Sequence, residues 1–194
     1  MKFWVKKLRE IIGLGIVLSL IFKNFTLLDD SEKRDILELR NQEYIRQSMI
    51  DDVVISLENH LAFLKSLETT KEKRYFAVFY KDELAGSVNF IKNGELFWGL
   101  YFKDELSPMV KSCGSYIFLE YLFKNHSKVI DSVVRKNNQK ALSFNKSFGF
   151  EVFNEDDEFV YLRLKEELWQ TKKNSKVLSG IKKYLDKIEF KFKE

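Results

Sequence analysis

The stretch that decides the fold class reads Asn138-Gln139-Lys140-Ala141-Leu142-Ser143-Phe144-Asn145-Lys146-Ser147-Phe148-Gly149-Phe150. Its first residue offers a helix N-cap, its apolar residues recur at helical spacing, and Gly149 is a typical C-terminal stop. Apolar stretches at 129–135 before it, and at 150–154 and 158–164 after it, predict strands. A strand, a helix and a returning hairpin indicate an α/β protein.

Upstream of this stretch, the patterns predict two helices and then a meander of strands. The first helix follows N-cap candidates at 29–31, and the second begins near Ser56. A third helix is predicted from about Gly114 to Asn125. The predicted strands are 25–28, 75–80, 84–91 and 96–102, with a hairpin signal at Asn93-Gly94. The resulting order, β-α-α-β-β-β-α-β-α-β-β, favours a mixed sheet.

Composition limits the classes of function. The chain has 194 residues, of which 45% are hydrophobic and 32% charged, which fits one globular domain. A net charge of +4 gives no argument for a nucleic-acid partner. The single cysteine, Cys113, excludes an intrachain disulfide, and with only His60 and His126 besides we expect no metal site. Cys113 itself is expected to be a small buried residue.

Both ends of the chain are expected to lie outside the main domain, which is predicted to span 23–165. Residues 1–22 form a basic and apolar N-terminal extension. Its apolar run is short for a membrane-spanning helix, which needs about 20 apolar residues. Three interpretations stay open for it: a peripheral helix on a membrane surface, a helix packed on the domain, or an extension with little role. Residues 166–194 are expected to form a basic helical tail.

The opening stretch also carries a resemblance to a known superfamily. Asn138, Ala141, Phe144, Gly149 and Phe150 match positions that are common in the GNAT N-acetyltransferases, and the order of elements resembles theirs. The resemblance implies the GNAT fold, an α/β architecture with a mixed, mostly antiparallel central sheet. In that fold one parallel pair of strands splays apart between flanking helices. It also implies acetyl-CoA as the co-substrate and N-acetyl transfer as the reaction.

Shorter pieces are similar to the GNAT family that acts in pseudaminic acid synthesis. They are Leu39-Arg40-Asn41, Ile45-Arg46, Met49, Ile55-Ser56, His60-Leu61, Tyr75-Phe76, Gly86, Phe90 and Gly99-Leu100-Tyr101. This likeness implies a cytoplasmic enzyme that acetylates the 4-amino group of a nucleotide sugar, UDP-4-amino-4,6-dideoxy-N-acetyl-β-L-altrosamine, for flagellin glycosylation. Two alternatives stay open: a GNAT acting on a protein N-terminus, an antibiotic or a polyamine, and a catalytically silent binding module. A homodimer stays open as well.

Two segments match the acetyl-CoA contacts of the superfamily. Free N–H groups at a helix N-terminus hold a pyrophosphate well. The segment that resembles the pyrophosphate loop, between a strand and a helix, is Val110, Lys111, Ser112, Cys113, Gly114 and Ser115. The resemblance places the pantetheine arm between strands 99–102 and 129–135. A bulge at Gly99 is expected to free the N–H groups near Leu100 and Tyr101 for the thioester oxygen, and Asn138 is expected to hold the cofactor arm or cap its helix.

The position of the general acid departs from the superfamily. Many GNAT enzymes use a tyrosine on the helix after the splayed strand, and the matching residue here is Asn145. An amide cannot donate a proton as an acid would, although it can hydrogen-bond a thiolate. Water, a nearby tyrosine such as Tyr101 or Tyr116, or no dedicated acid are the alternatives.

On the acceptor side, His60 is the candidate base because the pKa of an ordinary histidine suits that task. A contact to the sugar or nucleotide and a purely structural role are equal alternatives for it. The resemblance places further acceptor contacts at Arg40, Asn41 and Arg46, and an arginine pairs well with a diphosphate.

Overall fold

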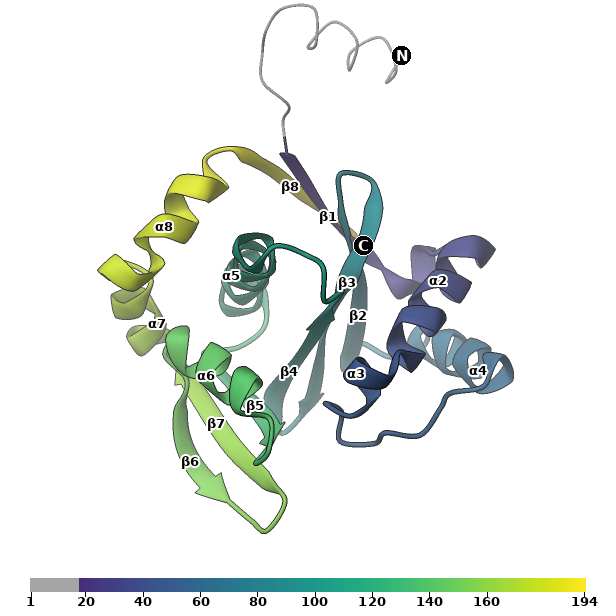
Figure 1. The fold of residues 1–194 in the computed structure, drawn as a ribbon, viewed down its shortest axis with the longest axis horizontal. Helices are drawn as coiled ribbons and strands as arrows, with labels where there is room; N and C mark the ends of the chain where they lie inside the picture. Colours follow the sequence, from purple (N-terminus) through teal and green to yellow (C-terminus); the bar gives the residue numbers. More distant parts are fainter. Residues whose placement is uncertain (1–17) are drawn as a thin grey trace, which may run out of the picture.

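The computed structural model describes residues 18–194, which fold around one sheet of eight strands (Figure 1). The strand order is β6-β7-β5-β4-β3-β2-β1-β8. Neighbouring strands are antiparallel except for β4–β5 and β1–β8, which are parallel. The bounds are β1 Leu18–Asn24, β2 Lys73–Tyr80, β3 Glu83–Asn93, β4 Glu95–Phe102, β5 Val129–Arg135, β6 Glu151–Glu155, β7 Phe159–Lys165 and β8 Ile188–Lys193. The mixed, mostly antiparallel sheet predicted from the sequence is confirmed.

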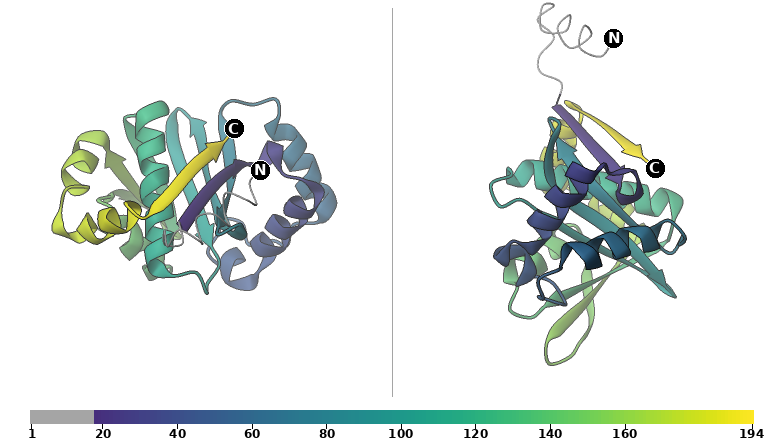
Figure 2. Two further views of the ribbon diagram at one scale, coloured as in Figure 1. Left: turned by 90° about the horizontal axis from the view of Figure 1, so that it is seen from above. Right: turned by 90° about the vertical axis from the view of Figure 1, so that its right-hand side faces the viewer.

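Helices cover both faces of this sheet (Figures 1 and 2). The helices α2, α3 and α4 lie on one face, and α5, α6, α7 and α8 lie on the other. Their bounds are α2 Asp30–Asn41, α3 Glu43–Arg46, α4 Leu57–Leu67, α5 Pro108–Asn125, α6 Gln139–Ser147, α7 Glu166–Lys172 and α8 Lys176–Leu185, with a short 3-10 helix at Phe25–Leu27. In the part of the chain from Leu18 onward, no helix has both the length and the apolar character needed to cross a membrane.

Alternating side chains of the central strands supply two cores, because successive residues of a strand point to opposite faces. Trp98 and Phe102 of β4 belong to the core against α5. Tyr101 lies next to Phe102 in the strand and points to the opposite face of the sheet. There it packs against the second core, which contains Ile36 of α2 and Leu64 of α4. Strand β4 therefore links the two sides of the molecule.

The N-terminal boundary differs from the expectation. The first strand is Leu18–Asn24, and the predicted strand at 25–28 is mostly a 3-10 turn. Leu20 and Phe22 are 1% and 0% exposed, so the end of the apolar run belongs to the sheet and the boundary expected at Lys23 falls inside β1. The membrane contact expected of residues 1–22 concerns a segment of which 1–17 lie outside the described residues.

The C-terminal segment is only in part the helical tail that was expected. After α7 and α8 it ends in β8, which pairs in parallel with β1 from Leu18 opposite Ile188 to Lys23 opposite Lys193. The ring of Phe192 stacks on that of Phe22 with a centroid distance of 4.5 Å. Trp169 of α7 is 0% exposed. Residues 166–194 are thus packed into the same sheet and core as the rest of the domain.

Helix α5 begins at Pro108, six residues before the start expected near Gly114. Proline is favoured at the first helical position, where its missing N–H leaves no hydrogen bond unmade. The free backbone N–H groups at the N-terminus of α5 therefore lie near residue 108 rather than near residue 114.

Candidate functional site

Strands β4 and β5 lie side by side only at their beginnings. Their parallel pairing consists of Leu96 opposite Ile130 and Phe97 opposite Asp131. Strand β4 continues to Phe102 and β5 to Arg135, so the two strands part from Trp98 onward. This is the splayed parallel pair that the superfamily resemblance implies. A gap of this kind exposes backbone groups that would be paired in a continuous sheet.

The phase of the β3–β4 ladder decides which backbone groups face the gap. Lys103 N donates to Ala85 O at 2.9 Å, and alternate residues of an antiparallel strand direct both backbone groups to the same partner. With the observed register, Tyr101 directs its N–H and C=O to Ser87 of β3. Leu100 directs its own toward β5, beyond the last β4–β5 pair. Of the two predicted donors, Leu100 is therefore available and Tyr101 is not.

The bulge expected at Gly99 is absent from β4, whose register with β3 is continuous from Glu95 to Phe102. Glycine at this position instead leaves room for a side chain of the neighbouring strand. A Cβ on Gly99 would lie 2.7 Å from Oδ1 of Asn89, its cross-strand partner. The missing side chain thus lets the Asn89 amide lie over β4 where the gap opens.

The N-terminus of α5 supplies the free donors for an anion. Lys111 N donates to Ser107 O at 3.1 Å, so the helical ladder begins there. Pro108 has no N–H, which leaves Met109 and Val110 as donors at the positive end of the helix. Of the segment predicted at 110–115, only Val110 presents a free N–H, because the later groups are used within the helix.

The rest of that segment packs α5 on the sheet. Gly114 faces Phe102 of β4, and a Cβ on Gly114 would lie in ordinary van der Waals contact with its Cζ, at 3.4 Å. Cys113 is fully buried, and burial raises the pKa of its thiol to about 11. The thiol stays protonated and unreactive at neutral pH. The expectation that Cys113 is a small buried residue is confirmed.

Two asparagines of α6 have structural partners. Asn138 Oδ1 accepts from Ala141 N at 3.0 Å, so Asn138 is the N-cap of α6. Asn145 is 6% exposed, and its Nδ2 donates to Ala141 O at 2.9 Å. Its Oδ1 accepts from Trp98 Nε1 at 3.2 Å. The Asn145 amide thus links α6 to β4, and one of the two N–H groups on Nδ2 is used within the protein.

Tyr101 and Tyr116, the candidate acids, lie on different sides of the sheet. Tyr116 belongs to α5, and its ring lies 5.0 Å from that of Trp169 in α7. Tyr101 packs at the border of the core formed with α2 and α4. Burial raises the pKa of both phenols, that of Tyr116 to about 12. Tyr101 therefore remains a hydrogen-bond donor at neutral pH.

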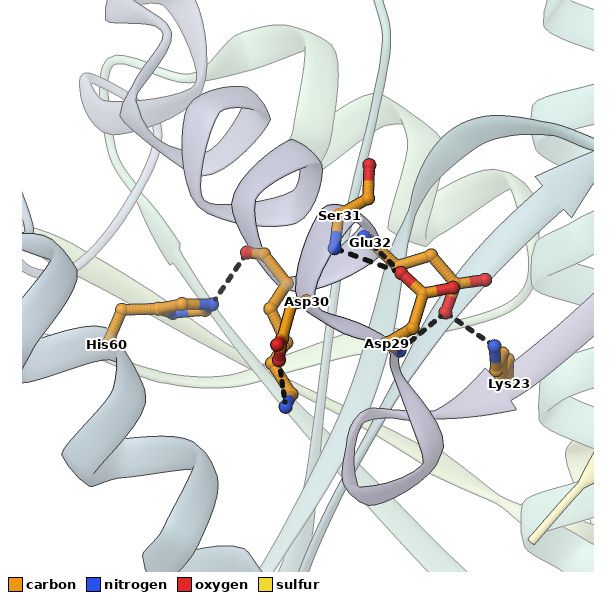
Figure 3. Close-up of polar contacts among 7 residues, drawn as sticks. Lys23, Asp29, Asp30, Ser31, Glu32 and His60 are labelled. Carbon is orange, nitrogen blue, oxygen red and sulfur yellow. Dashed lines mark hydrogen bonds and ion pairs between the residues drawn. The ribbon is translucent and has the colours of Figure 1, made fainter.

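His60 is turned toward the beginning of α2 (Figure 3). Its Nε2 lies 3.0 Å from Lys33 O, and burial lowers the pKa of the ring. Arg40 lies further along the same helix, about 10 Å from Lys33 at the usual helical rise. The geometry favours the structural alternative for His60, a buried link between α4 and α2, over a base beside the gap.

The predicted acceptor residues gather on the backbone of the loop 47–56, which joins α3 to α4. Arg40 Nη2 donates to Asp51 O at 2.9 Å, and Arg46 Nη1 donates to Asp52 O at 2.7 Å. Asn41 Nδ2 donates to Ile55 O at 2.8 Å and Asn41 Oδ1 accepts from Ile55 N at 2.9 Å. The structure thus brings these three residues together as supports of one loop.

Arg40 keeps one donor for another partner. Its Nη1 is buried and makes no hydrogen bond within residues 18–194. The charge of Arg40 interacts with Tyr101 and Tyr75, which places the guanidinium on the α2 side of the sheet near β4. Ser87 Oγ, 1% exposed as a residue, lies close to the Tyr101 phenol but makes no hydrogen bond of good geometry. Buried polar groups without partners call for an explanation, and a ligand is one.

The sequence patterns did not single out Ser87, Asn89 or Arg135. Ser87 and Asn89 are alternate residues of β3, and their side chains lie on the Tyr101 side of the sheet. Arg135 ends β5 and reaches the 47–56 loop. The one sequence signal for Ser87 and Asn89 was their alternate spacing in a predicted strand, which places both side chains on the same face of the sheet. Among the described residues, no three His, Cys, Asp or Glu side chains are grouped so that they could hold a metal ion.

Comparisons with known proteins agree with this geometry. No family model matches the chain. It is 33% identical over 150 residues to the acetyltransferase PseH of Campylobacter jejuni strain 81-176. That alignment covers 74% of this chain and 92% of the PseH protein. The crystal structure of Campylobacter jejuni N-acetyltransferase PseH with acetyl coenzyme A superposes with a TM-score of 0.63 and 30% identity. That alignment covers 76% of this chain and 99% of the solved one.

A more distant structure shows how widely the fold is shared. Spermidine N-acetyltransferase from Vibrio cholerae, solved with CoA and spermine, superposes with a TM-score of 0.68 at 16% identity, over 79% of this chain and 98% of the other. Identity at this level shows the fold alone. The fold is that of the GNAT acetyltransferases, as the sequence predicted, and it does not by itself select the acceptor.

Proposed function

The chain belongs to the PseH family of acetyltransferases, and on that premise we propose that it transfers the acetyl group of acetyl-CoA to an amino group of a nucleotide-linked sugar. The specific acceptor we propose is UDP-4-amino-4,6-dideoxy-N-acetyl-β-L-altrosamine, acetylated at its 4-amino group for pseudaminic acid synthesis and flagellin glycosylation. One observation carries the proposal: β4 forms one side of the β4–β5 gap and also carries Tyr101, whose phenol interacts with Arg40, the residue that keeps an unpartnered donor.

The cofactor side rests on backbone donors. We assign the pyrophosphate of acetyl-CoA to the N–H groups of Met109 and Val110, because unpaired donors and the helix dipole meet there. The pantetheine arm takes the place of the missing strand pairing along β4. The N–H of Leu100 then meets the thioester oxygen and stabilises the negative charge that develops on it. Asn138, at the end of the gap, keeps its proposed second role as a contact to this arm.

The acceptor side rests on Arg40, Tyr101 and Ser87. Arg40 Nη1 is a buried cationic donor, and the two hydroxyl groups accept and donate hydrogen bonds. Such a set suits an acceptor rich in oxygens, such as a sugar or its diphosphate. A cation at this point disfavours a polyamine, whose positive charges it would repel.

Proton transfer needs no dedicated side chain in this proposal. His60 is engaged with Lys33 O, and Tyr101 is protonated at neutral pH. The amine therefore loses its proton to water, the departing thiolate of CoA takes a proton from water, and Tyr101 contributes as a hydrogen-bond donor to the acceptor. Since acetyl-CoA and nucleotide sugars are made in the cytoplasm, we place the reaction there. A homodimer and a membrane contact of the N-terminal segment stay predictions.

The test incubates purified protein with acetyl-CoA and the UDP-4-amino sugar, and it follows released thiol together with product mass. We expect a nucleotide sugar that is heavier by one acetyl group. Spermidine, an N-terminal peptide and an aminoglycoside serve as competing acceptors. Ready acetylation of one of these without any acetylated sugar would replace the proposed acceptor. CoA binding without turnover of any amine would instead indicate a silent binding module.

A further inference from the structure

Apart from Met49, which packs against the core formed with α2 and α4, the 47–56 loop is held mainly by its carbonyl groups. Ile50, Val53 and Val54 are 59% to 64% exposed, so their burial stabilises the loop little. Four consecutive carbonyl oxygens instead accept hydrogen bonds from guanidinium groups. The acceptors are those of Met49, Ile50, Asp51 and Asp52. Hydrogen bonds with a charged donor are the stronger kind.

One of these guanidinium groups comes from the other side of the gap. Arg40 and Arg46 belong to α2 and α3, which come just before the loop in sequence, whereas Arg135 is the last residue of β5. Arg135 Nε donates to Met49 O at 2.7 Å, and its Nη2 donates to Ile50 O at 2.8 Å. A two-pronged contact of this kind fixes the orientation of the loop as well as its distance.

The Arg135 side chain is itself oriented from the β7 side. Its Nη1 lies 3.7 Å from Oε2 of Glu158, and its guanidinium lies 5.2 Å from the ring centroid of Phe159. The group therefore has one edge on the loop and one edge on the hairpin of β6 and β7. Arg135 thus connects β5, which forms one side of the cofactor gap, to the 47–56 loop. Arg40 supports the same loop from α2.

We propose that Arg135 is a positioning residue that ties the 47–56 loop to β5 and thereby sets the distance between the acceptor amine and the acetyl thioester. The inference rests on the proposed function, because it takes the loop as the wall of the acceptor site. Acyl transfer requires the reacting atoms to be about 3–3.5 Å apart, and a misplacement of about 1 Å costs on the order of 100-fold in rate. Without Arg135 the loop keeps its hydrogen bonds to Arg40 of α2 and Arg46 of α3 but loses those that fix its position relative to β5 and the cofactor gap.

The test compares Arg135→Met with Glu158→Gln in the full chain. The first variant removes both loop hydrogen bonds, and the second removes only the ion pair on the opposite edge of the guanidinium. Backbone amide exchange across 47–56 is followed by mass spectrometry, and steady-state kinetics are measured for both substrates. We expect Arg135→Met to speed exchange in the loop and to lower kcat/KM for the acceptor by about 10-fold to 100-fold, with CoA affinity unchanged. Glu158→Gln is expected to behave like the wild type, and Arg135→Lys to recover part of the loss.

Exchange in 47–56 that is the same in Arg135→Met and the wild type would overturn the proposal. So would a loss that falls equally on both substrates and follows a lowered Tm, because that pattern marks a general structural role. The exchange measurement needs no acceptor. If the wild-type protein fails to acetylate the sugar, the proposed function is wrong, yet the exchange result still decides whether Arg135 holds the loop.

Discussion

Trp98 Nε1 donates a hydrogen bond to Asn145 Oδ1 at 3.2 Å, and this bond joins β4 to α6 at the point where β4 and β5 separate. Trp98 is the first residue of β4 beyond the last pair with β5, and Asn145 lies on α6, the helix that follows β5. The indole also stacks on Phe150 with a centroid distance of 5.1 Å. The residue at the superfamily's acid position therefore closes the base of the gap.

Asn145→Ala is expected to act mainly on stability. It leaves the buried indole N–H of Trp98 without a partner, which costs about 1–3 kcal/mol in the free energy of unfolding. Turnover should fall only modestly, because an amide cannot donate a proton to the thiolate as an acid would. Denaturant unfolding and steady-state kinetics measure the two effects. Trp98→Phe removes the same bond from its other end, so the double variant should lose less than the sum of the two.

A loss of several orders of magnitude in kcat for Asn145→Ala, with CoA binding intact, would contradict this account. That result would mean that the amide leaves Trp98 during the reaction and forms a hydrogen bond that matters in the transition state.

Local signals were enough to predict the elements around the gap. Helix α6 was predicted because its cap and its stop are encoded nearby: Asn138 caps it, and Gly149 adopts a φ of +100° that favours glycine. The splayed strands followed from the superfamily resemblance rather than from a pattern in β4 or β5.

Contacts between distant parts of the chain could not be predicted in this way. Strand β1 was missed because no turn or breaker residue separates its apolar residues from the apolar residues before them. Its partner β8 also lies at the other end of the chain. The contact of Arg135 with Met49 O joins residues 86 positions apart. Its acceptor is a backbone oxygen, which every residue type carries, so no residue pattern could mark it.

Met109→Glu tests the assignment of the anion site. Met109 is 36% exposed in the first turn of α5, where a carboxylate suits the helix dipole but repels a pyrophosphate. We expect an unchanged or raised Tm without ligand, together with weaker CoA binding. In the wild type, CoA at about 100 times its Kd should stabilise the fold by about 2.7 kcal/mol. Met109→Gln is the neutral control of similar size. Equal CoA affinity in the two variants would move the phosphate site elsewhere.

Two N-terminal truncations locate the domain boundary. A chain beginning at Leu18 keeps β1, whereas one beginning at Lys23 loses the buried side chains of Leu20 and Phe22 and most of the pairing with β2 and β8. Each lost side chain accounts for about 1.5–3 kcal/mol, in a domain stabilised by only about 5–15 kcal/mol. We expect the shorter chain to be unfolded or strongly destabilised in thermal unfolding, and the longer one to resemble the full protein. A folded, active chain from Lys23 would refute the role assigned to β1.

Cys113 is expected to resist thiol reagents in the folded protein. Burial raises the pKa of its thiol to about 11, so at pH 8 the reactive thiolate is scarcer than in the unfolded chain. Because the folded-state pKa exceeds the unfolded one, this group's contribution to stability is present below the ordinary thiol pKa and is lost as pH rises toward 11. Labelling with a chromogenic disulfide should be slow natively and fast in denaturant. Fast native labelling would show that α5 opens readily.

Arg40→Ala separates two roles of one side chain. Arg40 supports the 47–56 loop through Nη2 and keeps Nη1 for the acceptor, whereas Arg46 supports the same loop through Asp52 O. Arg46 Nη1 and Nε are both bonded within the protein, so Arg46→Ala is the matched control that loosens the loop without removing the free donor of Arg40. A hydrogen bond from a charged donor is worth about 1.5–3 kcal/mol, so Arg40→Ala should raise KM for the nucleotide sugar by about 10-fold to 100-fold.

The rise in Arg46→Ala should be smaller, and CoA affinity should be unchanged in both. Equal effects in the two variants would mean that Arg40 acts only through the loop, and the acceptor contact would then have to be sought at Ser87 and Tyr101.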